Sequence, residues 1–208
     1  MRAAATAHAQ PAAVCRLPEA LKAALTLALS LLGGLPTLGA ASDAHHPIAA
    51  AEPRDYWTGP IDSPVPATLA GGTVIHARQL RQLLEDGRAV IVDVSNAPRR
   101  PDGLAAGAPW LPLPHRAIPG SIWIPGAGRG KIPPATDGFL QRRLAAATGN
   151  DLARPLVVYC HRQCWLSWNA AKRAIRYGYR NVYWFADGVE GWRAAGLRTA
   201  PVAPEPTP

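Results

Sequence analysis

The sequence predicts an α/β fold in which helices cover both faces of a parallel sheet. Short apolar runs rich in β-branched residues alternate along the chain with stretches of helical spacing. Strands of a parallel sheet are buried on both faces, and they therefore appear in the sequence as continuous apolar segments. The predicted strands are residues 73–75, 89–94, 121–124, 156–159 and 181–185.

The predicted helices lie between and after these strands. Leu80 and Leu84 share one face of the first helix, and Gly178 is the expected C-terminal stop of the third. Six prolines between residues 95 and 120 predict a long irregular loop. The predicted helices are residues 76–85, 137–147, 167–177 and 189–195.

Residues 1–41 have the order of a secretory signal peptide. Basic residues precede an apolar run over residues 23–32, and small residues follow around Ala40. The run is short compared with the ~20 apolar residues of a membrane-spanning helix. We therefore expect cleavage, no remaining membrane span and a periplasmic protein, with a retained anchor as the alternative. Without this leader the formal net charge falls from +8 to +6, which favours anionic ligands.

The rest of the chain divides into three parts by composition. Residues 42–70 are rich in proline and alanine and predict an extended arm, from which Tyr56 and Trp57 pack onto the domain. Residues 71–200 form the predicted domain. The proline-rich residues 201–208 are expected to be a disordered tail.

Cys160 follows a buried strand directly and precedes a helix. Backbone N–H groups at a helix start are unpaired, and the helix dipole adds partial positive charge there. A cysteine at such a position has a lowered pKa and is reactive, so Cys160 is predicted to be the more reactive thiol. His161 and Arg162 add positive charge. The alternative is that Cys160 is a small buried apolar residue.

The sequence resembles the rhodanese-like family. The matching marks are Asp93 after a strand, residues 118–122 before the next, Cys160 after a third and residues 188–192 near the end. The resemblance implies a single rhodanese-like domain with a five-stranded parallel sheet flanked by helices on both faces. It also implies that Cys160 carries sulfane sulfur as a persulfide and that Asp93 supports the site.

Within that family, the chain is similar to the PQQ-dependent catabolism-associated CXXCW motif proteins. Residues 160–165, 167–174 and 64–69 carry the similarity. It implies an exported protein associated with periplasmic quinoprotein alcohol oxidation. A quinoprotein dehydrogenase or a cytochrome is the partner that this implies.

The loop after Cys160 departs from ordinary sulfurtransferases. Gln163 stands where those enzymes have a glycine, and Ser167 comes one residue later than usual. Leu166 replaces the arginine that related phosphatases need. We therefore expect sulfur transfer from thiosulfate or another sulfane-sulfur donor, with a non-catalytic or thiol-redox accessory module as the alternative.

Cys164 is a second thiol in the same loop. Its spacing from Cys160 permits a disulfide without demanding one, so it either resolves a persulfide or packs beside Trp165. The predicted site comprises Cys160, Cys164, His161, Arg162, Gln163, Trp165, Leu166, Ser167 and Asp93.

Other ligand classes have weak support in the sequence. Residues 126–131 form a basic glycine-rich loop, but Pro125 and Ile132 break the phosphate-loop pattern. The basic residues are not interleaved with aromatics, so nucleic-acid binding is not expected. No cofactor and no metal are predicted, although a copper- or thiol-handling role is a third alternative. The expected substrate is a small sulfur-containing or anionic molecule.

Overall fold

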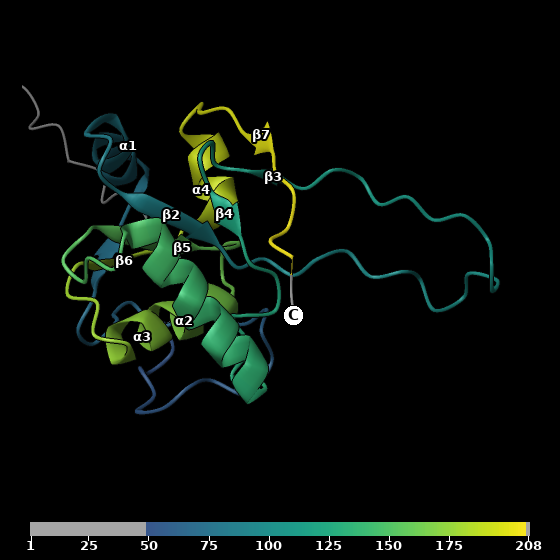
Figure 1. The fold of residues 1–208 in the computed structure, drawn as a ribbon, viewed down its shortest axis with the longest axis horizontal. Coiled ribbons are helices and arrows are strands. Elements are labelled where there is room, and N and C mark those ends of the chain that lie inside the picture. Colours follow the sequence, from purple (N-terminus) through teal and green to yellow (C-terminus); the bar gives the residue numbers. More distant parts are fainter. Residues whose placement is uncertain (1–48, 207–208) are drawn as a thin grey trace, which may run out of the picture. The chain divides into compact units, whose positions relative to one another are not determined.

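The computed structural model describes residues 49–206, which form the predicted parallel sheet and its helices (Figure 1). The predicted signal peptide, residues 1–41, lies outside the described residues. No described helix has the length and apolar character needed to cross a membrane. The elements are β1 Thr73–Ile75, α1 Ala77–Glu85, β2 Val90–Asp93, β3 Arg116–Ala117, β4 Ile122–Trp123, α2 Pro134–Thr148, β5 Leu156–Tyr159, α3 Trp165–Arg176, β6 Val182–Phe185, α4 Gly188–Ala194 and β7 Ala200–Pro201.

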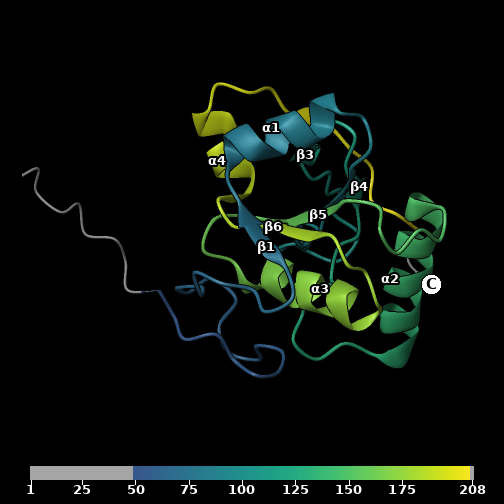
Figure 2. The ribbon, with the colours of Figure 1, turned by 90° about the vertical axis from the view of Figure 1, so that its left-hand side faces the viewer.

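The main sheet has five parallel strands in the order β1-β6-β5-β2-β4. Every residue of β2 and β5 is buried, as expected for strands covered on both faces. Helices α1 and α4 lie on one face, and α2 and α3 lie on the other (Figure 2). Leu80 and Trp192 belong to the apolar layer between the sheet and helices α1 and α4. Leu140 and Trp168 belong to the layer between the sheet and helices α2 and α3. The predicted fold class is confirmed.

Helices α2 and α3 begin more than one residue earlier than the sequence pattern predicts. Helix α2 begins at Pro134, because proline is well suited to a first turn whose N–H groups have no helical partner. Helix α3 begins at Trp165 and not at residue 167, since Cys164 already has the extended backbone of an N-cap residue. The loop that starts at Cys160 is therefore short.

The arm packs against α3 over most of its described length. Val65 and Leu69 are buried in the layer between the arm and the sheet. The ring of Trp57 stacks on that of Trp165, with centroids 4.4 Å apart. The indole N–H of Trp168 donates to the carbonyl of Thr68 at 3.1 Å. The arm is thus part of the folded core, and the domain does not start at residue 71.

The expected disordered tail is wrong for residues 201–206. Strand β7 pairs with β3 as an antiparallel ribbon, which the sequence analysis missed. Further along, Pro204 forms a bridge with Trp123, and the Glu205 carboxylate lies 2.7 Å from Arg143. Strand β4 is the edge of the sheet, so its unpaired backbone groups accept this segment. Order here comes from pairing with a distant edge, which composition does not reveal.

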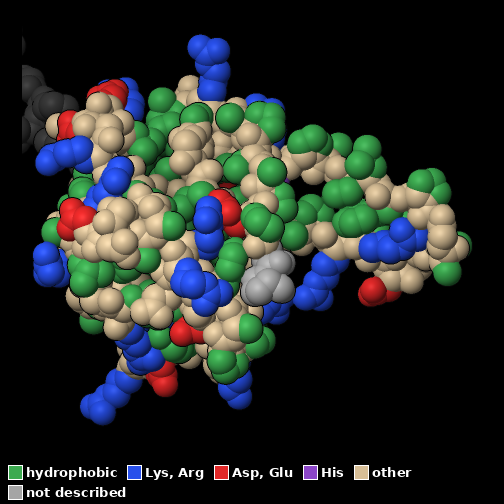
Figure 3. Space-filling model, in the orientation of Figure 1, with side chains coloured by type: hydrophobic (Ala, Val, Ile, Leu, Met, Phe, Trp, Pro, Cys, Tyr) green, Lys and Arg blue, Asp and Glu red, His purple; other side chains and the backbone are tan. Residues whose placement is uncertain are grey.

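The proline-rich loop between β2 and β3 projects from the domain (Figure 1). Apolar side chains lie along the projection (Figure 3). Leu111 is 94% exposed and Leu113 is 88% exposed. The loop therefore adds little to the core.

The buried arm predicts a contrast between two leucine substitutions. Leu69→Ala should lower the free energy of unfolding by about 2–5 kcal/mol, because it leaves a cavity under the arm. Leu113→Ala should change it by less than about 0.5 kcal/mol. Denaturant unfolding of the two variants measures both values. Equal effects would contradict the role of the arm in the core.

Candidate functional site

The loop between β5 and α3 lies at the C-terminal edge of the parallel sheet, where ligands bind in open α/β folds. Gln163 has a φ of 55°, in the left-handed region that favours glycine. The loop therefore has the left-handed backbone conformation that a glycine adopts easily, although Gln163 occupies this position. The side-chain carbonyl of Gln163 also accepts the N–H of Val65 at 3.1 Å, which ties the loop to the arm.

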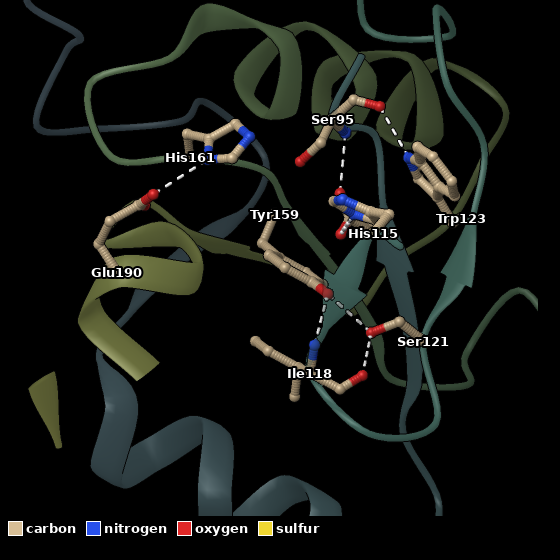
Figure 4. A network of polar contacts seen from close by, with 9 residues as sticks. Ser95, His115, Ile118, Ser121, Trp123, Tyr159, His161 and Glu190 are labelled. Carbon is tan, nitrogen blue, oxygen red and sulfur yellow. Dashed lines mark hydrogen bonds and ion pairs between the residues drawn. The ribbon is translucent and has the colours of Figure 1, made fainter. Parts of the chain in front are cut away.

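Helix α4 holds the other side of this loop. The N–H of Val189 donates to the carbonyl of Cys160 at 2.9 Å. The Glu190 carboxylate accepts the backbone N–H of Arg162 at 2.9 Å and lies 3.0 Å from Nδ1 of His161 (Figure 4). A Cβ on Gly188 would lie 2.4 Å from the carbonyl carbon of His161, so only glycine allows this approach. Burial disfavours ionisation of Glu190, but these two hydrogen bonds outweigh it and lower its pKa.

The two thiols lie beneath the loop and are not joined in a disulfide. Cys160 is fully buried and Cys164 is 3% exposed. The Cys160 thiol donates to Oγ of Ser167 at 3.1 Å. The same oxygen accepts the indole N–H of Trp184 at 3.0 Å, and the Ser167 hydroxyl donates to the Cys164 carbonyl at 3.3 Å. Ser167 therefore lies at the centre of the polar contacts around Cys160, and Trp184 is a contributor that the sequence analysis missed.

The acidity of the thiols is the reverse of the expected order. Burial, followed by the adjacent Cys164 sulfur, raises the pKa of Cys160 well above its usual value. The adjacent Cys160 thiol lowers the pKa of Cys164, although burial opposes this. The expected lowered pKa of Cys160 is wrong, because desolvation exceeds the effect of the helix start. The N–H groups of Arg162 and Trp165 also donate elsewhere, to Glu190 and to the Ile61 carbonyl.

The arm covers the start of α3 and the cysteine next to it. Asp62 and Cys164 form an antiparallel bridge, and the Ile61 carbonyl accepts the Trp165 N–H at 2.9 Å. The indole N–H of Trp165 donates to Oγ of Ser63 at 2.9 Å. These contacts join residues about a hundred positions apart, and no sequence motif indicates them.

Two cavities open over the outer side of the loop. Their volumes are about 330 Å³ and 470 Å³, and both are lined by Pro64, Arg162 and Gln163. Neither cavity is lined by a cysteine. Arg162 can meet an anion there, while the sulfurs lie below the arm and the loop. Trp165 and Leu166 are buried in the core beside α3.

Asp93 makes its contacts at a different part of the C-terminal edge of the sheet. Its carboxylate accepts the N–H of Ser95 and lies 2.8 Å from Nε2 of His115 (Figure 4). The hydroxyl of Tyr159 accepts the N–H of Ile118 at 2.9 Å, and burial raises the pKa of this tyrosine. These contacts hold the base of the projecting loop. None of the described hydrogen bonds of Asp93 reaches either cysteine.

Within residues 49–206, no three histidine, cysteine, aspartate or glutamate side chains gather as metal ligands. The candidate site contains a pair of thiols with neighbouring basic residues. The structure brings together Cys160, Cys164 and Ser167 and places Arg162 on the outside.

Alkylation with iodoacetamide should modify Cys164 at lower pH than Cys160. A lowered pKa provides thiolate at lower pH, and the raised pKa of Cys160 delays its reaction. Cys160→Ala removes the hydrogen-bond donor and should move the Cys164 profile to higher pH. Cys160→Ser keeps a donor and is the control. Peptide mass spectrometry measures the profiles, and earlier labelling of Cys160 would contradict this order.

Comparisons with known proteins identify the family. Residues 76–195, more than half of the chain, match the family model of the rhodanese-like domain. A comparison with curated proteins gives no match.

Solved structures with sequence identities below 25% also resemble this chain. A thiosulfate sulfurtransferase from Pseudomonas aeruginosa is 22% identical with a TM-score of 0.44, over 67% of this chain and 22% of that one. A polysulfide-sulfur transferase from Wolinella succinogenes is 19% identical with a TM-score of 0.39, over 63% and 80%. A human single-domain sulfurtransferase is 24% identical with a TM-score of 0.36, over 58% and 95%. The chain thus spans less than a quarter of the Pseudomonas protein. On the match to its family model, this chain belongs to the rhodanese-like domain family.

Proposed function

We propose that the protein is sulfurtransferase-like and carries a sulfane sulfur on the pair Cys160 and Cys164. The observation that supports this most is the placement of both thiols in one buried loop at the end of a parallel strand, with Sγ of Cys160 3.5 Å from the Cys164 carbonyl oxygen. The pKa of Cys160 is raised and that of its neighbour Cys164 is lowered. Family membership and the sulfurtransferase descriptions of similar structures agree with this chemistry.

Sulfur enters in this proposal through Cys164, the more acidic thiol. Its thiolate attacks the outer sulfur of thiosulfate, the S–S bond of the donor breaks, and sulfite leaves. The product is a persulfide anion on Cys164. Cys160 then attacks the outer sulfur, so that the persulfide passes to Cys160 and the Cys160 proton passes to the Cys164 thiolate.

A thiol-redox module is the second candidate function. If Cys160 attacks the inner sulfur instead, a Cys160–Cys164 disulfide forms and hydrosulfide leaves with the Cys160 proton. The full burial of Cys160 beside Cys164 favours this candidate, since the neighbouring thiol reaches the persulfide more readily than an external acceptor does. The two candidates thus differ in which sulfur Cys160 attacks.

Access for a donor is proposed to occur where the arm meets the loop. The cavities lined by Pro64, Arg162 and Gln163 lie on that side, and Arg162 supplies a charge for an anionic sulfur compound. Residues 60–66 then separate from α3 to uncover Cys164. Within this segment Asp62 and Pro64 are exposed, whereas Val65 and Pro66 are buried, so opening costs the apolar contacts of these last two residues.

The proposed setting is the periplasm, after export through residues 1–41. The order of basic, apolar and small residues supports export, and the similarity to the CXXCW motif proteins supports an association with quinoprotein alcohol oxidation. A quinoprotein dehydrogenase or its cytochrome is the proposed partner. Two neighbouring thiols in such a compartment encounter oxidants, which suits a redox role as well.

Mass spectrometry after exposure to thiosulfate tests the proposal. The wild type should gain one sulfur atom on Cys160, whereas Cys160→Ser should retain it on Cys164 and Cys164→Ser should gain none. A disulfide with released sulfide would favour the redox module instead. Protein alkylated beforehand is the control. Unchanged thiols in the wild type would contradict both candidates.

Export predicts a mature protein that starts close to residue 42. N-terminal sequencing of the protein from a periplasmic fraction should find a first residue between positions 40 and 45. The apolar run is too short for a stable anchor, which is why cleavage is expected. A protein that retains Met1 and stays with the membrane would contradict it.

A further inference from the structure

A separate cavity of about 300 Å³ lies between the arm and the basic loop before α2. Trp57, Thr58 and Ile61 line it from the arm, and Arg129 and Lys131 line it from the loop. It shares no lining residue with the two cavities over the loop that follows Cys160. The function proposed above makes no use of this cavity.

Buried polar side chains of α3 hold the two segments that line this cavity. The fully buried Asn169 accepts the N–H of Trp57 at 2.8 Å and donates to the carbonyls of Trp57 and Gly128 at 3.0 and 3.1 Å. Arg173 is 2% exposed and donates to the Gly130 carbonyl at 2.9 Å. Burying such groups is costly unless they are bonded, and here their bonds tie two connecting segments together.

Two glycines let these segments approach closely. A Cβ on Gly128 would lie 2.4 Å from the Leu166 carbonyl oxygen, and one on Gly130 would lie 2.0 Å from the Trp57 carbonyl oxygen. Both neighbours are backbone atoms and cannot move aside easily. The backbone at Gly128, Gly130 and Trp57 is therefore closely packed before any ligand binds, which lowers the entropic cost of binding.

The charge at the cavity is positive. Neither Arg129 nor Lys131 takes part in an ion pair among the described residues, and no carboxylate lines the cavity. The nearby carboxylates of Asp137 and Asp55 instead face Arg173 and Arg176. Two free cations beside an apolar wall suit a ligand with an acidic group and a small apolar body.

We propose that this cavity binds a small organic anion. Its acidic group lies between Arg129 and Lys131, and its apolar body rests against Trp57 and Ile61. The glycine-rich loop that does not fit a phosphate-binding motif thus has a role as one wall of an anion site. This inference stands independently of the thiol chemistry.

Calorimetric titration of the purified protein with benzoate tests the site. The double variant Arg129→Ala/Lys131→Ala should bind benzoate at least about tenfold more weakly, because two charge-assisted contacts are lost. Arg129→Lys/Lys131→Arg keeps both charges and should bind within about threefold of the wild type. Arg78→Ala/Arg88→Ala removes two exposed cations elsewhere and is the matched control. Thermal unfolding of all variants shows that they remain folded.

Three results would overturn the proposal. The first is no benzoate binding by the wild type, and the second is equal binding by the wild type and Arg129→Ala/Lys131→Ala. The third is tighter binding of a short glutamate peptide than of benzoate through the same two residues, which would assign the cavity to an acidic protein segment. Weaker binding of inorganic sulfate than of benzoate would support the apolar wall formed by Trp57 and Ile61.

Discussion

The contact between the arm and the first turn of α3 determines most of what this site can do. A helix normally begins with backbone N–H groups that lack partners, and these groups attract anions. Here the Ile61 carbonyl accepts the N–H of Trp165, and Trp57 stacks on the Trp165 ring. An N–H group at the start of α3 that could bind an anion is thus used to hold the arm. Because that segment lies over the loop, the neighbouring sulfurs are removed from water.

Removal from water separates the roles of the two cysteines. In an exposed loop, the residue at the end of the strand would feel the positive helix end and ionise first. Under the arm, the cost of charge falls most heavily on Cys160, which therefore keeps its proton and donates it to Ser167, while the pKa of Cys164 is lowered. Ser167 and Trp184 fix the Cys160 sulfur within the core. Cys160 thus lies at the end of the strand, whereas Cys164 in the same short loop has the lowered pKa.

The sequence was sufficient for the parts that local patterns control. Continuous apolar runs located β2 and β5, and their order with the helices predicted the sheet and the loop at Cys160. Other features depend on partners far away in the chain. The docking of the arm, the pairing of β7 with β3 and the burial that inverts the thiol acidities leave no periodic pattern. Glu190 lies within residues 188–192, one of the marks of the family resemblance, but its contact with Arg162 follows from how α4 approaches the loop. Gly188 was the available signal for that approach.

The projecting loop between β2 and β3 has a consequence for the integrity of the chain. Parallel pairing joins β1 to β6 and β2 to β5 and β4, so each of the two strands before the loop pairs with strands from after it. A single cut near the tip of the loop would therefore leave two fragments that interlock through the sheet. Exposed loop tips are favoured sites of proteolytic nicking and of tolerated insertion. The same arrangement lets the protein be reassembled from two separately made pieces, divided where the chain contributes least to the core.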